Sequence, residues 1–343
     1  MNASTRLGGF KILNEVVWIS VIQPKEDHRF PTAFSNLVSS EKINLPFLTC
    51  GEQNQAWGLN LVVDSQDAEK TLGLIEKEFS DINPTTTKCA ILSIFPHRSK
   101  PEIIGVLLDV LGKLGDQPIA FANSPSAISA VLNEDVMNEA TAALFGPFQF
   151  GPYRTPADWK LAQKGKEELY KEVVASYQEK KPKVYGLEWQ EEQELLHVKL
   201  DSAHLSTMGT VFKDFARLGL VLTFFISRPS KEKNKGNLFF CLPESDKHDY
   251  IGMIQKLLPD ASTVEDSSVA SFSMNGPHFG DRYGIASELL LVLDEVKVEL
   301  LGLSCSIHSI TGVLPADQIH PAIEAIQGCF EVPSVIKKTY SQS

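Results

Sequence analysis

The hydrophobic and polar positions of this chain repeat one pattern four times. In each copy, an apolar, β-branched run that predicts a strand leads through a polar loop into an amphipathic helix, and two further short strands and a second helix follow. Repetition at this scale is typical of a chain built from several similar supersecondary units. The pattern therefore predicts an α+β protein of four modules, each too small to bury much surface alone and so expected to pair.

The predicted elements follow the same order in each copy. The first copy has strands at 15–22, 45–50 and 57–63 and helices at 30–40 and 66–79. The second has strands at 89–95, 119–123 and 127–132 and helices at 100–114 and 134–144. The third has strands at 195–200, 220–227 and 237–242 and helices at 207–218 and 247–258. The fourth has strands at 269–273, 298–304 and 309–314 and helices at 280–293 and 316–329.

These elements predict module boundaries at 8–82, 86–150, 183–262 and 263–338. Residues 151–182 lie between the second and third modules and predict a linker helix, because their apolar residues recur at roughly helical spacing. We expect this stripe to pack on the same chain rather than on a partner. Both halves also begin alike, with an extra strand at 9–13 or 184–189 and a polar turn before the first module strand.

Charge and cysteine usage narrow the class of protein. The formal net charge of -11 argues against binding to nucleic acid, and the short basic run of Lys231, Lys233 and Lys235 predicts a solvated hairpin tip. Five well-separated cysteines without a CxxC pair favour a reducing compartment over a disulfide framework. The chain lacks both an apolar run long enough to cross a bilayer and a signal-peptide pattern at its start, so we expect a cytoplasmic protein without membrane contact.

Glycines gather at the start of the first helix of the fourth copy. Gly276, Gly280 and Gly284 lie within nine residues, around Asp281. Glycine allows the backbone to approach a ligand closely, and the free N–H groups of a helix start attract a carboxylate. Asp281 could accept hydrogen bonds from an α-amino group, which would complete a site for an amino acid. The alternative is that the glycines form a tight loop and Asp281 caps the helix.

Two stretches resemble a known family. The segment VYGLEWQEEQELLHVKL at 184–200 resembles the strand hairpin that leads into the regulatory region of aspartate kinases. The run FGDRYGIASELLLVL at 279–293, followed by VKVELLGLSCSI, resembles the Asp-x-x-Gly-[Ile/Val]-Ala loop and second strand of the ACT domain. Four tandem ACT modules without a kinase domain also resemble the cytosolic arginine sensors of eukaryotes.

The resemblance implies a fold and a ligand site. It implies four ferredoxin-like ACT modules with antiparallel sheets and helices on one face, paired side by side into eight-stranded sheets, module 1 with 3 and module 2 with 4. The ligand would lie between the module 4 loop and a strand of module 2. The implied ligand-binding residues are Asn275, Gly276, His278, Phe279, Gly280, Asp281, Tyr283, Gly284, Ile285, Leu303 and Ser304 of module 4, and Phe121, Ala122, Asn123 and Ser124 of module 2. Alternatively, Asn123 and Ser124 merely turn the chain, and Phe279 and Tyr283 are core residues.

The other three copies depart from the family loop. Phe30-Pro31-Thr32 stands in the first copy where the family has Pro-Gly, and the loops at 97–101 and 201–205 contain no glycine. Only the fourth copy keeps Gly280, Asp281 and Gly284 together. We therefore expect a single ligand site.

No catalytic or metal-binding constellation stands out in the sequence. The histidines lack metal-ligand spacing, and phosphate-loop, GxSxG and HExxH motifs are absent from the sequence. The sequence therefore predicts no metal, no cofactor and no enzyme, although an unfamiliar active site stays open. The leading hypothesis is a non-catalytic amino-acid-binding regulator acting through a protein partner or a homodimer. The alternative is a scaffold of ACT-like modules that acts by oligomerisation without a ligand.

Overall fold

A computed structural model gives the arrangement of most of the chain. It describes residues 5–24, 29–53, 55–96, 99–114, 118–151, 153, 155, 157–158, 181–232, 234–245, 247–276, 283–306 and 309–339. The predicted linker helix therefore lies almost entirely outside the described residues. Among the described helices, none is both long and apolar enough to cross a membrane.

The element order strand, helix, strand, strand, helix occurs four times. The N-terminal half contains β2 (Gly9–Pro24), α1 (Phe30–Ser40), β3 (Phe47–Gln53), β4 (Ala56–Asp64) and α2 (Ala68–Glu78), and then β5 (Thr85–Phe95), α3 (Pro101–Leu111), β6 (Ala120–Asn123), β7 (Ile128–Asn133) and α4 (Met137–Leu144). The C-terminal half contains β9 (Gly186–Asp201), α7 (Leu205–Arg217), β10 (Phe224–Arg228), β11 (Lys235–Pro243) and α8 (Tyr250–Leu257), and then β12 (Ser262–Asn275), α9 (Ile285–Glu295), β13 (Gly302–Cys305), β14 (Ser309–Pro315) and α10 (Ile319–Cys329). We refer to these four groups as units 1 to 4.

Short elements complete the fold. Single turns of 3-10 helix precede α2, α4, α7 and α10, at Ser65–Asp67, Glu134–Val136, Ser202–His204 and Ala316–Gln318. β1 (Thr5–Leu7) pairs in parallel with β8 (Phe148–Phe150), and β15 (Val335–Lys337) pairs in parallel with β9.

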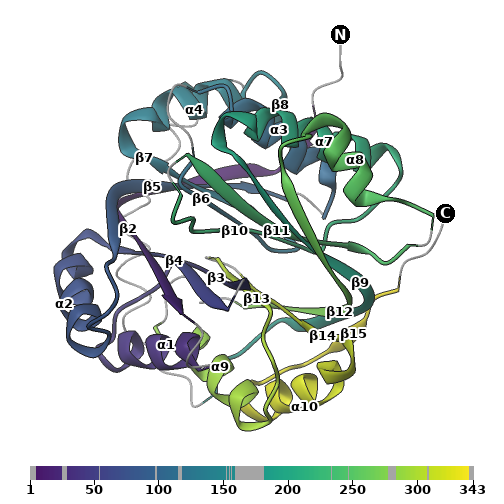
Figure 1. The fold of residues 1–343 in the computed structure, drawn as a ribbon. Coiled ribbons are helices and arrows are strands. Elements are labelled where there is room, and N and C mark those ends of the chain that lie inside the picture. The colour runs from purple at the N-terminus through teal and green to yellow at the C-terminus, as the bar shows by residue number, and fades with distance from the viewer. Residues whose placement is uncertain are drawn as a thin grey trace.

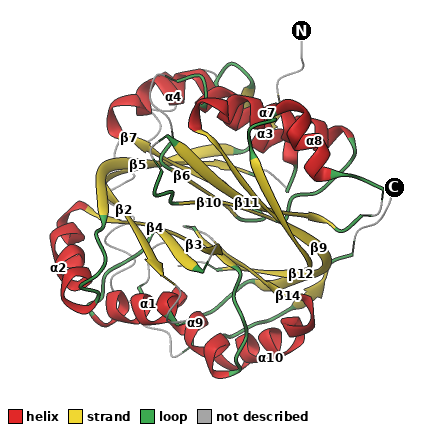
Figure 2. Ribbon diagram, viewed as in Figure 1, coloured by secondary structure: helices red, strands yellow, loops and turns green. Residues whose placement is uncertain are grey.

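The strands form two stacked layers, and the helices cover the outer faces (Figures 1 and 2). One layer runs β2–β5–β7–β6–β10–β11–β9–β12, and the other runs β5–β2–β4–β3–β13–β14–β12–β9, with β15 as a further edge strand. This arrangement confirms the α+β fold class with eight-stranded antiparallel sheets. The two layers are continuous, because β2, β5, β9 and β12 are long enough to contribute to both.

The strands β2 and β9 were each predicted as two elements joined by a turn, and this prediction is wrong. β2 continues through the predicted turn with a bulge between Leu13 and Val16, where Glu15 has a positive φ of 58°. β9 does the same around Glu192, whose φ is 57°. The bulges let the strand bend from one layer into the other without losing its partners. Polar residues inside an apolar pattern suggest a turn, but in β2 and β9 they lie at a bulge.

The predicted pairing of module 1 with 3 and of module 2 with 4 is also wrong. β3 of unit 1 pairs with β13 of unit 4, and β6 of unit 2 pairs with β10 of unit 3. The first helices of units 2 and 3 fit this pairing. A Cβ atom on Gly105 of α3 would lie only 2.5 Å from the carbonyl oxygen of Gly209 in α7. These two glycines allow the two helices to pack closely, whereas α1 and α9 contain no glycine.

Alternating side chains of the strands build separate cores. In β3, Leu48 and Cys50 join the core beneath the helices, whereas Phe47 faces the other layer. Two glycines admit aromatic rings between the layers, because a Cβ on Gly51 would meet Phe239 at 2.8 Å and one on Gly302 would meet Phe224 at 2.9 Å. The layers are therefore packed face to face without helices between them.

Candidate functional site

The start of α9 has the geometry expected of a ligand loop. The helix begins at Ile285, five residues later than predicted, because Gly284 has a left-handed φ of +87° that a right-handed helix cannot include. Gly284 is the N-cap residue, and glycine has no side chain to accept a hydrogen bond from the first helical N–H groups. Asp281, which the alternative interpretation places at the cap, lies outside the described residues. Helix starts without a side-chain cap provide donors for an anion.

Helix α1 of unit 1 lies against this helix start. A Cβ atom on Gly284 would lie 2.8 Å from the Ser39 hydroxyl oxygen. The Ser287 hydroxyl donates a hydrogen bond to the side-chain oxygen of Asn36. Unit 1 therefore contributes to the surroundings of the predicted loop, which the sequence analysis missed because it assigned the facing surface to module 2.

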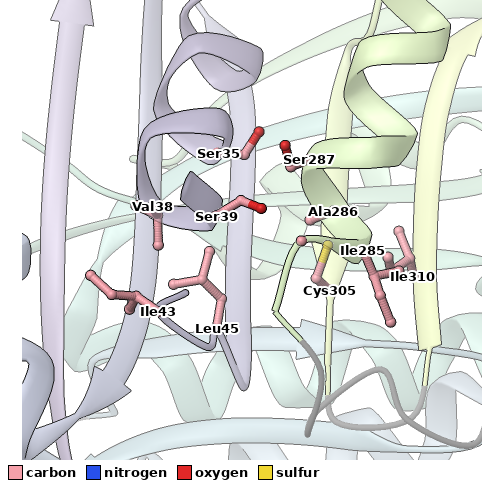
Figure 3. A pocket seen from close by; sticks show the side chains of 11 residues that line it. Ser35, Val38, Ser39, Ile43, Leu45, Ile285, Ala286, Ser287, Cys305 and Ile310 are labelled. Atoms are coloured by element: carbon pink, nitrogen blue, oxygen red, sulfur yellow. The ribbon is translucent and has the colours of Figure 1, made fainter. Parts of the chain in front are cut away.

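A small pocket lies between α1 and α9, above the end of β13 (Figure 3). It encloses about 20 Å³, or about 370 Å³ when the adjoining space open to solvent is included. The described lining residues are Ser35, Val38, Ser39, Ile43, Leu45, Gly284, Ile285, Ala286, Ser287, Cys305 and Ile310. None of these carries a formal charge. Burial raises the pKa of the Cys305 thiol well above its usual value, so this thiol stays protonated.

The opposite face of β13 meets unit 2. The Ser304 hydroxyl donates a hydrogen bond of 2.7 Å to the Asn123 carbonyl oxygen at the end of β6. The side-chain oxygen of Asn123 accepts a bond of 2.6 Å from the Phe225 backbone N–H. The Asn123 amide nitrogen is buried, and among the described residues it has no hydrogen-bond partner. An unsatisfied buried donor is uncommon in a folded protein and often marks a missing partner.

Further polar contacts cross between the layers nearby. The Ser227 carbonyl oxygen accepts bonds from Thr49 Oγ1 at 3.0 Å and from Asn60 Nδ2 at 2.9 Å. Arg228 donates to the carbonyl oxygens of Gly51 at 3.0 Å and Ala56 at 2.8 Å. Burial lowers the pKa of Arg228 to about 10, which still leaves it protonated at neutral pH. The sequence contains no signal for this network, because its members lie on strands of units 1 and 3, which are far apart in the chain.

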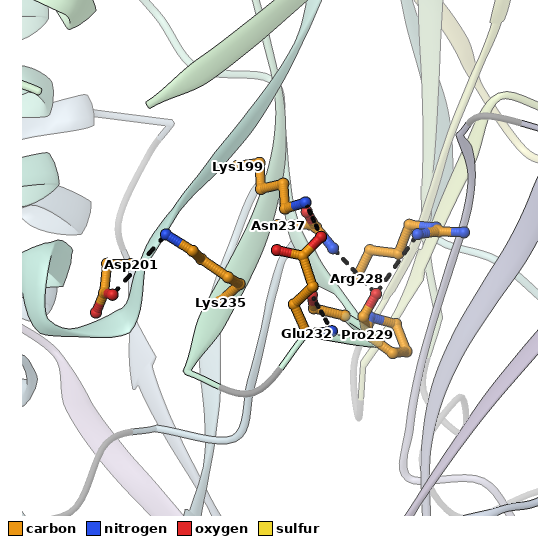
Figure 4. Close-up of polar contacts among 8 residues, drawn as sticks. Lys199, Asp201, Arg228, Pro229, Glu232, Lys235 and Asn237 are labelled. Carbon is orange, nitrogen blue, oxygen red and sulfur yellow. Dashed lines mark hydrogen bonds and ion pairs between the residues drawn. The ribbon is translucent and has the colours of Figure 1, made fainter. Parts of the chain in front are cut away.

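The β10–β11 hairpin carries the predicted basic tip (Figure 4). Lys235 lies 3.9 Å from Asp201, and Glu232 of the same hairpin pairs with Lys199. The Asn237 side chain donates to the Pro229 carbonyl oxygen at 3.0 Å, close to Arg228. Lys231 is exposed and Lys233 lies outside the described residues. The hairpin tip is therefore an exposed surface with paired charges, and it lies next to the buried Arg228.

The predicted site residues fall into three groups. His278, Phe279, Gly280 and Asp281 lie outside the described residues. Asn275, Gly276, Tyr283, Gly284 and Ile285 stand at the end of β12 and the start of α9. Leu303, Ser304, Phe121, Ala122, Asn123 and Ser124 lie on or beside β13 and β6. Among the described members of this set, Ser304 and Asn123 are the pair joined by a hydrogen bond between units 4 and 2.

Several of these residues have structural partners. Phe121 packs in a core with Phe225, at 5.8 Å between ring centroids. Leu303 is fully buried in the other core, and Ala122 lies in an inner cluster. The Ser124 hydroxyl accepts a bond of 3.0 Å from the Ala127 N–H, which fits the alternative that it turns the chain. The role of these residues in ligand binding stays a prediction.

The equivalent interface between α3 and α7 is closed. Besides the contact of Gly105 with Gly209, Asp109 of α3 accepts bonds from Ser206 at 2.6 Å and from Lys213 at 2.9 Å. The α1–α9 pair of first helices, in contrast, has the pocket described above.

The described residues contain no group of three or more His, Cys, Asp or Glu side chains arranged to hold a metal ion. Five cysteines are free, and burial raises the pKa of Cys50 and of Cys89 to about 12. The described cysteines therefore supply no thiolate at neutral pH.

Comparisons with known proteins identify the fold. No protein-family model matches the sequence, and no curated protein matches it. Among solved structures, aspartate kinase from Synechocystis matches with a TM-score of 0.77 and 14% identity, over 100% of this chain and 59% of that one. The chain has an aspartate-kinase-like fold. It spans 59% of the length of that kinase.

Two further solved structures match part of the chain. The ligand-free regulatory subunit of aspartate kinase from Thermus thermophilus matches with a TM-score of 0.38 and 13% identity, over 43% of this chain and 98% of that one. Aspartate kinase from Clostridium acetobutylicum matches with a TM-score of 0.38 and 12% identity, over 45% of this chain and 37% of that one.

The likeness to the Synechocystis protein corrects one prediction. We predicted from the sequence that the chain is not an enzyme, but the solved structure that matches all of it is a kinase, which is a catalytic enzyme. The fold therefore gives no ground for excluding catalysis. At 14% identity the likeness establishes the fold, and the activity of the kinase is not carried over to this chain.

Proposed function

We propose that this chain binds a free amino acid and uses it to regulate a protein partner or its own homodimer. Four ACT-like modules with boundaries at 8–82, 86–150, 183–262 and 263–338 form the framework of this proposal. Both the ACT-like motif at 279–293 and the aspartate-kinase-like fold favour it. The ligand would lie at the end of β13, beside the loop that enters α9.

The observation that carries the proposal is the start of α9 at the α1–α9 pocket. Gly284 is left-handed, this N-cap residue has no side chain that could cap the helix, and Ser39 of another unit lies close to the same point. The first N–H groups of α9 would bind the ligand carboxylate, helped by the helix dipole. Asp281, by the family resemblance, would accept hydrogen bonds from the α-amino group.

The buried amide nitrogen of Asn123 supports a contribution from module 2. It lies at the end of β6, where the Asn123 carbonyl oxygen already accepts a bond from Ser304. An amino acid that reached the end of β13 could supply the missing acceptor. The proposal therefore keeps Asn123 and Ser304 in the site, together with the residues of the module 4 loop.

Thermal unfolding of the full chain with each of the twenty amino acids tests the proposal. A ligand that binds only the folded state stabilises it by about 2.7 kcal/mol at a hundredfold excess over its dissociation constant. We expect one or a few amino acids to raise the midpoint, and Asp281→Ala to abolish the rise. If none of the twenty shifts the midpoint, the proposal is wrong.

The Asn123→Asp variant tests module 2 separately. It keeps a side-chain oxygen for the Phe225 N–H and removes the amide donor. We expect ligand affinity to fall at least about tenfold, since a hydrogen bond to a charged group is worth about 1.5–3 kcal/mol. Circular dichroism checks that the variant is folded. Unchanged affinity in a folded variant would remove Asn123 from the site.

The scaffold alternative draws support from exposed apolar residues at one sheet edge. Val335 and Ile336 of β15 are 37% and 49% exposed. The same strand carries Lys337, which pairs with Glu191, and charged edges discourage strand addition. We therefore favour amino-acid binding. A dimer whose mass is independent of every amino acid would favour the scaffold.

A further inference from the structure

The α1–α9 pocket has a chemical character that narrows the ligand. Figure 3 shows the hydroxyl groups of Ser35, Ser39 and Ser287 close to one another across the gap between the two helices. Beneath them lie apolar groups from both units, which are Val38, Ile43, Leu45, Ile285, Cys305 and Ile310. The pocket therefore has a hydroxyl-lined side and an apolar floor.

The described walls contain no charged side chain to neutralise a charged ligand group. Burying an unpaired charge is costly, and in practice a site avoids it by pairing the charge or by excluding it. An ammonium, guanidinium or carboxylate side chain that entered between α1 and α9 would meet the hydroxyl groups and hydrocarbon of the described lining residues. A methyl or hydroxyl group would meet complementary surroundings.

The size of the pocket also favours a small ligand group. The enclosed volume is about 20 Å³, which is enough for about one water molecule. A side chain with up to two heavy atoms beyond Cβ fits this space without moving the helices. A long side chain would need α1 and α9 to separate, although Ser287 and Asn36 hold them together.

We infer that the α1–α9 pocket receives the side chain of a small, uncharged amino acid of the alanine, serine and threonine class. This inference rests on the proposed function, because it uses the start of α9 as the carboxylate site. With the carboxylate at the first N–H groups of α9, the side chain enters between Ser39 and Ser287. In this arrangement unit 4 binds the carboxylate of the ligand, and unit 1 helps to determine which side chains fit.

Isothermal titration calorimetry of the full chain tests the inference with six ligands: L-alanine, L-serine, L-threonine, L-lysine, L-arginine and L-aspartate. We expect the tightest of the first three to bind at least about tenfold more tightly than any of the last three, because tenfold corresponds to about 1.4 kcal/mol. If a charged amino acid binds most tightly, this inference is overturned and the proposed function stands. If none of the twenty amino acids binds, the proposed function itself fails.

A pocket variant with a matched control provides the second test. Leu45→Ala removes three carbon atoms from the pocket floor, whereas Leu74→Ala removes the same atoms from α2, in the same core but outside the pocket. We expect Leu45→Ala to shift the preference at least about threefold toward L-valine and L-leucine, and Leu74→Ala to leave the ranking unchanged. An unchanged ranking in a folded Leu45→Ala variant would overturn the inference.

Discussion

Ser304 and Asn123 are 181 positions apart in the sequence, and the Ser304 hydroxyl donates a 2.7 Å hydrogen bond to the Asn123 carbonyl oxygen. This bond joins unit 4 to unit 2, which are not edge neighbours in either layer. The two units therefore meet face to face. A structural change at the end of β13 can therefore affect the end of β6 through this direct contact, without being transmitted along the sheet.

Removing this hydroxyl should weaken the contact between the layers. In Ser304→Ala, the Asn123 carbonyl oxygen loses its donor from β13 in a buried position, which typically costs about 1–3 kcal/mol of the free energy of unfolding. Urea denaturation measures this loss. The control is Ser40→Ala, because the exposed Ser40 hydroxyl bonds only within α1, to the Leu37 carbonyl oxygen. The control should change stability by less than about 0.5 kcal/mol, and an equal loss in both variants would contradict the role of Ser304.

Gly284 should be irreplaceable at the start of α9. Gly284→Ala forces a Cβ atom into a left-handed conformation and to within 2.8 Å of the Ser39 hydroxyl oxygen. We expect a loss of about 1–3 kcal/mol in the free energy of unfolding, together with weaker amino-acid binding. Gly73→Ala in α2 is the matched control, because a Cβ there meets nothing within 4 Å. The control should be neutral or stabilising by up to about 1 kcal/mol. If Gly284→Ala behaves like the control, the helix start is not constrained as described.

The sequence predicts the elements well and their arrangement poorly. The helix at 30–40 matches α1, because Phe30, Phe34 and Val38 recur at helical spacing and Pro31 fits the first turn. The pairing of units could not be predicted in this way. It includes the close approach of Gly105 and Gly209, and a glycine inside a helix is not by itself a signal of which helix it meets.

The candidate site was predicted only in part, because some of its residues come together only through the pairing of the units. Gly284 stands out in the sequence because a glycine at a helix start suggests a special backbone conformation. Ser35 and Ser39 do not stand out, because serine in a polar helix face is usually solvated. They join the pocket only through the pairing of units 1 and 4, which periodicity does not encode.

The closed α3–α7 interface predicts one ligand per chain. Calorimetric titration with the amino acid found in the thermal screen should give a stoichiometry of one per chain. Two equivalent sites would contradict this, because they would require the second pair of first helices to open as well. The Gly105→Ala variant examines the closure directly, since its Cβ would lie 2.5 Å from a backbone oxygen. We expect it to cost about 1–3 kcal/mol through overpacking, whereas Gly328→Ala, with nothing within 4 Å, should not destabilise.

Asp109 should make the free energy of unfolding depend on pH. Burial alone would raise the pKa of Asp109, but hydrogen bonds from Lys113, Ser206 and Lys213 outweigh burial and lower the pKa to about 2. Because the pKa is lower in the folded state than the usual value of about 3.9, the carboxylate stabilises the fold above about pH 4. This contribution is lost as the pH falls from about 4 through about 2.

Comparison of the wild type with Asp109→Asn tests this dependence. At pH 6, the variant should be less stable by about 1–2 kcal/mol, after allowance for the partial exposure of the carboxylate. At pH 3, the difference should be smaller, because the unfolded wild type then binds a proton that the folded state resists. Lys213→Met should reduce the pH dependence by removing one of the three donors. A difference between wild type and Asp109→Asn that is constant from pH 6 to pH 3 would show that Asp109 acts by packing rather than by its charge.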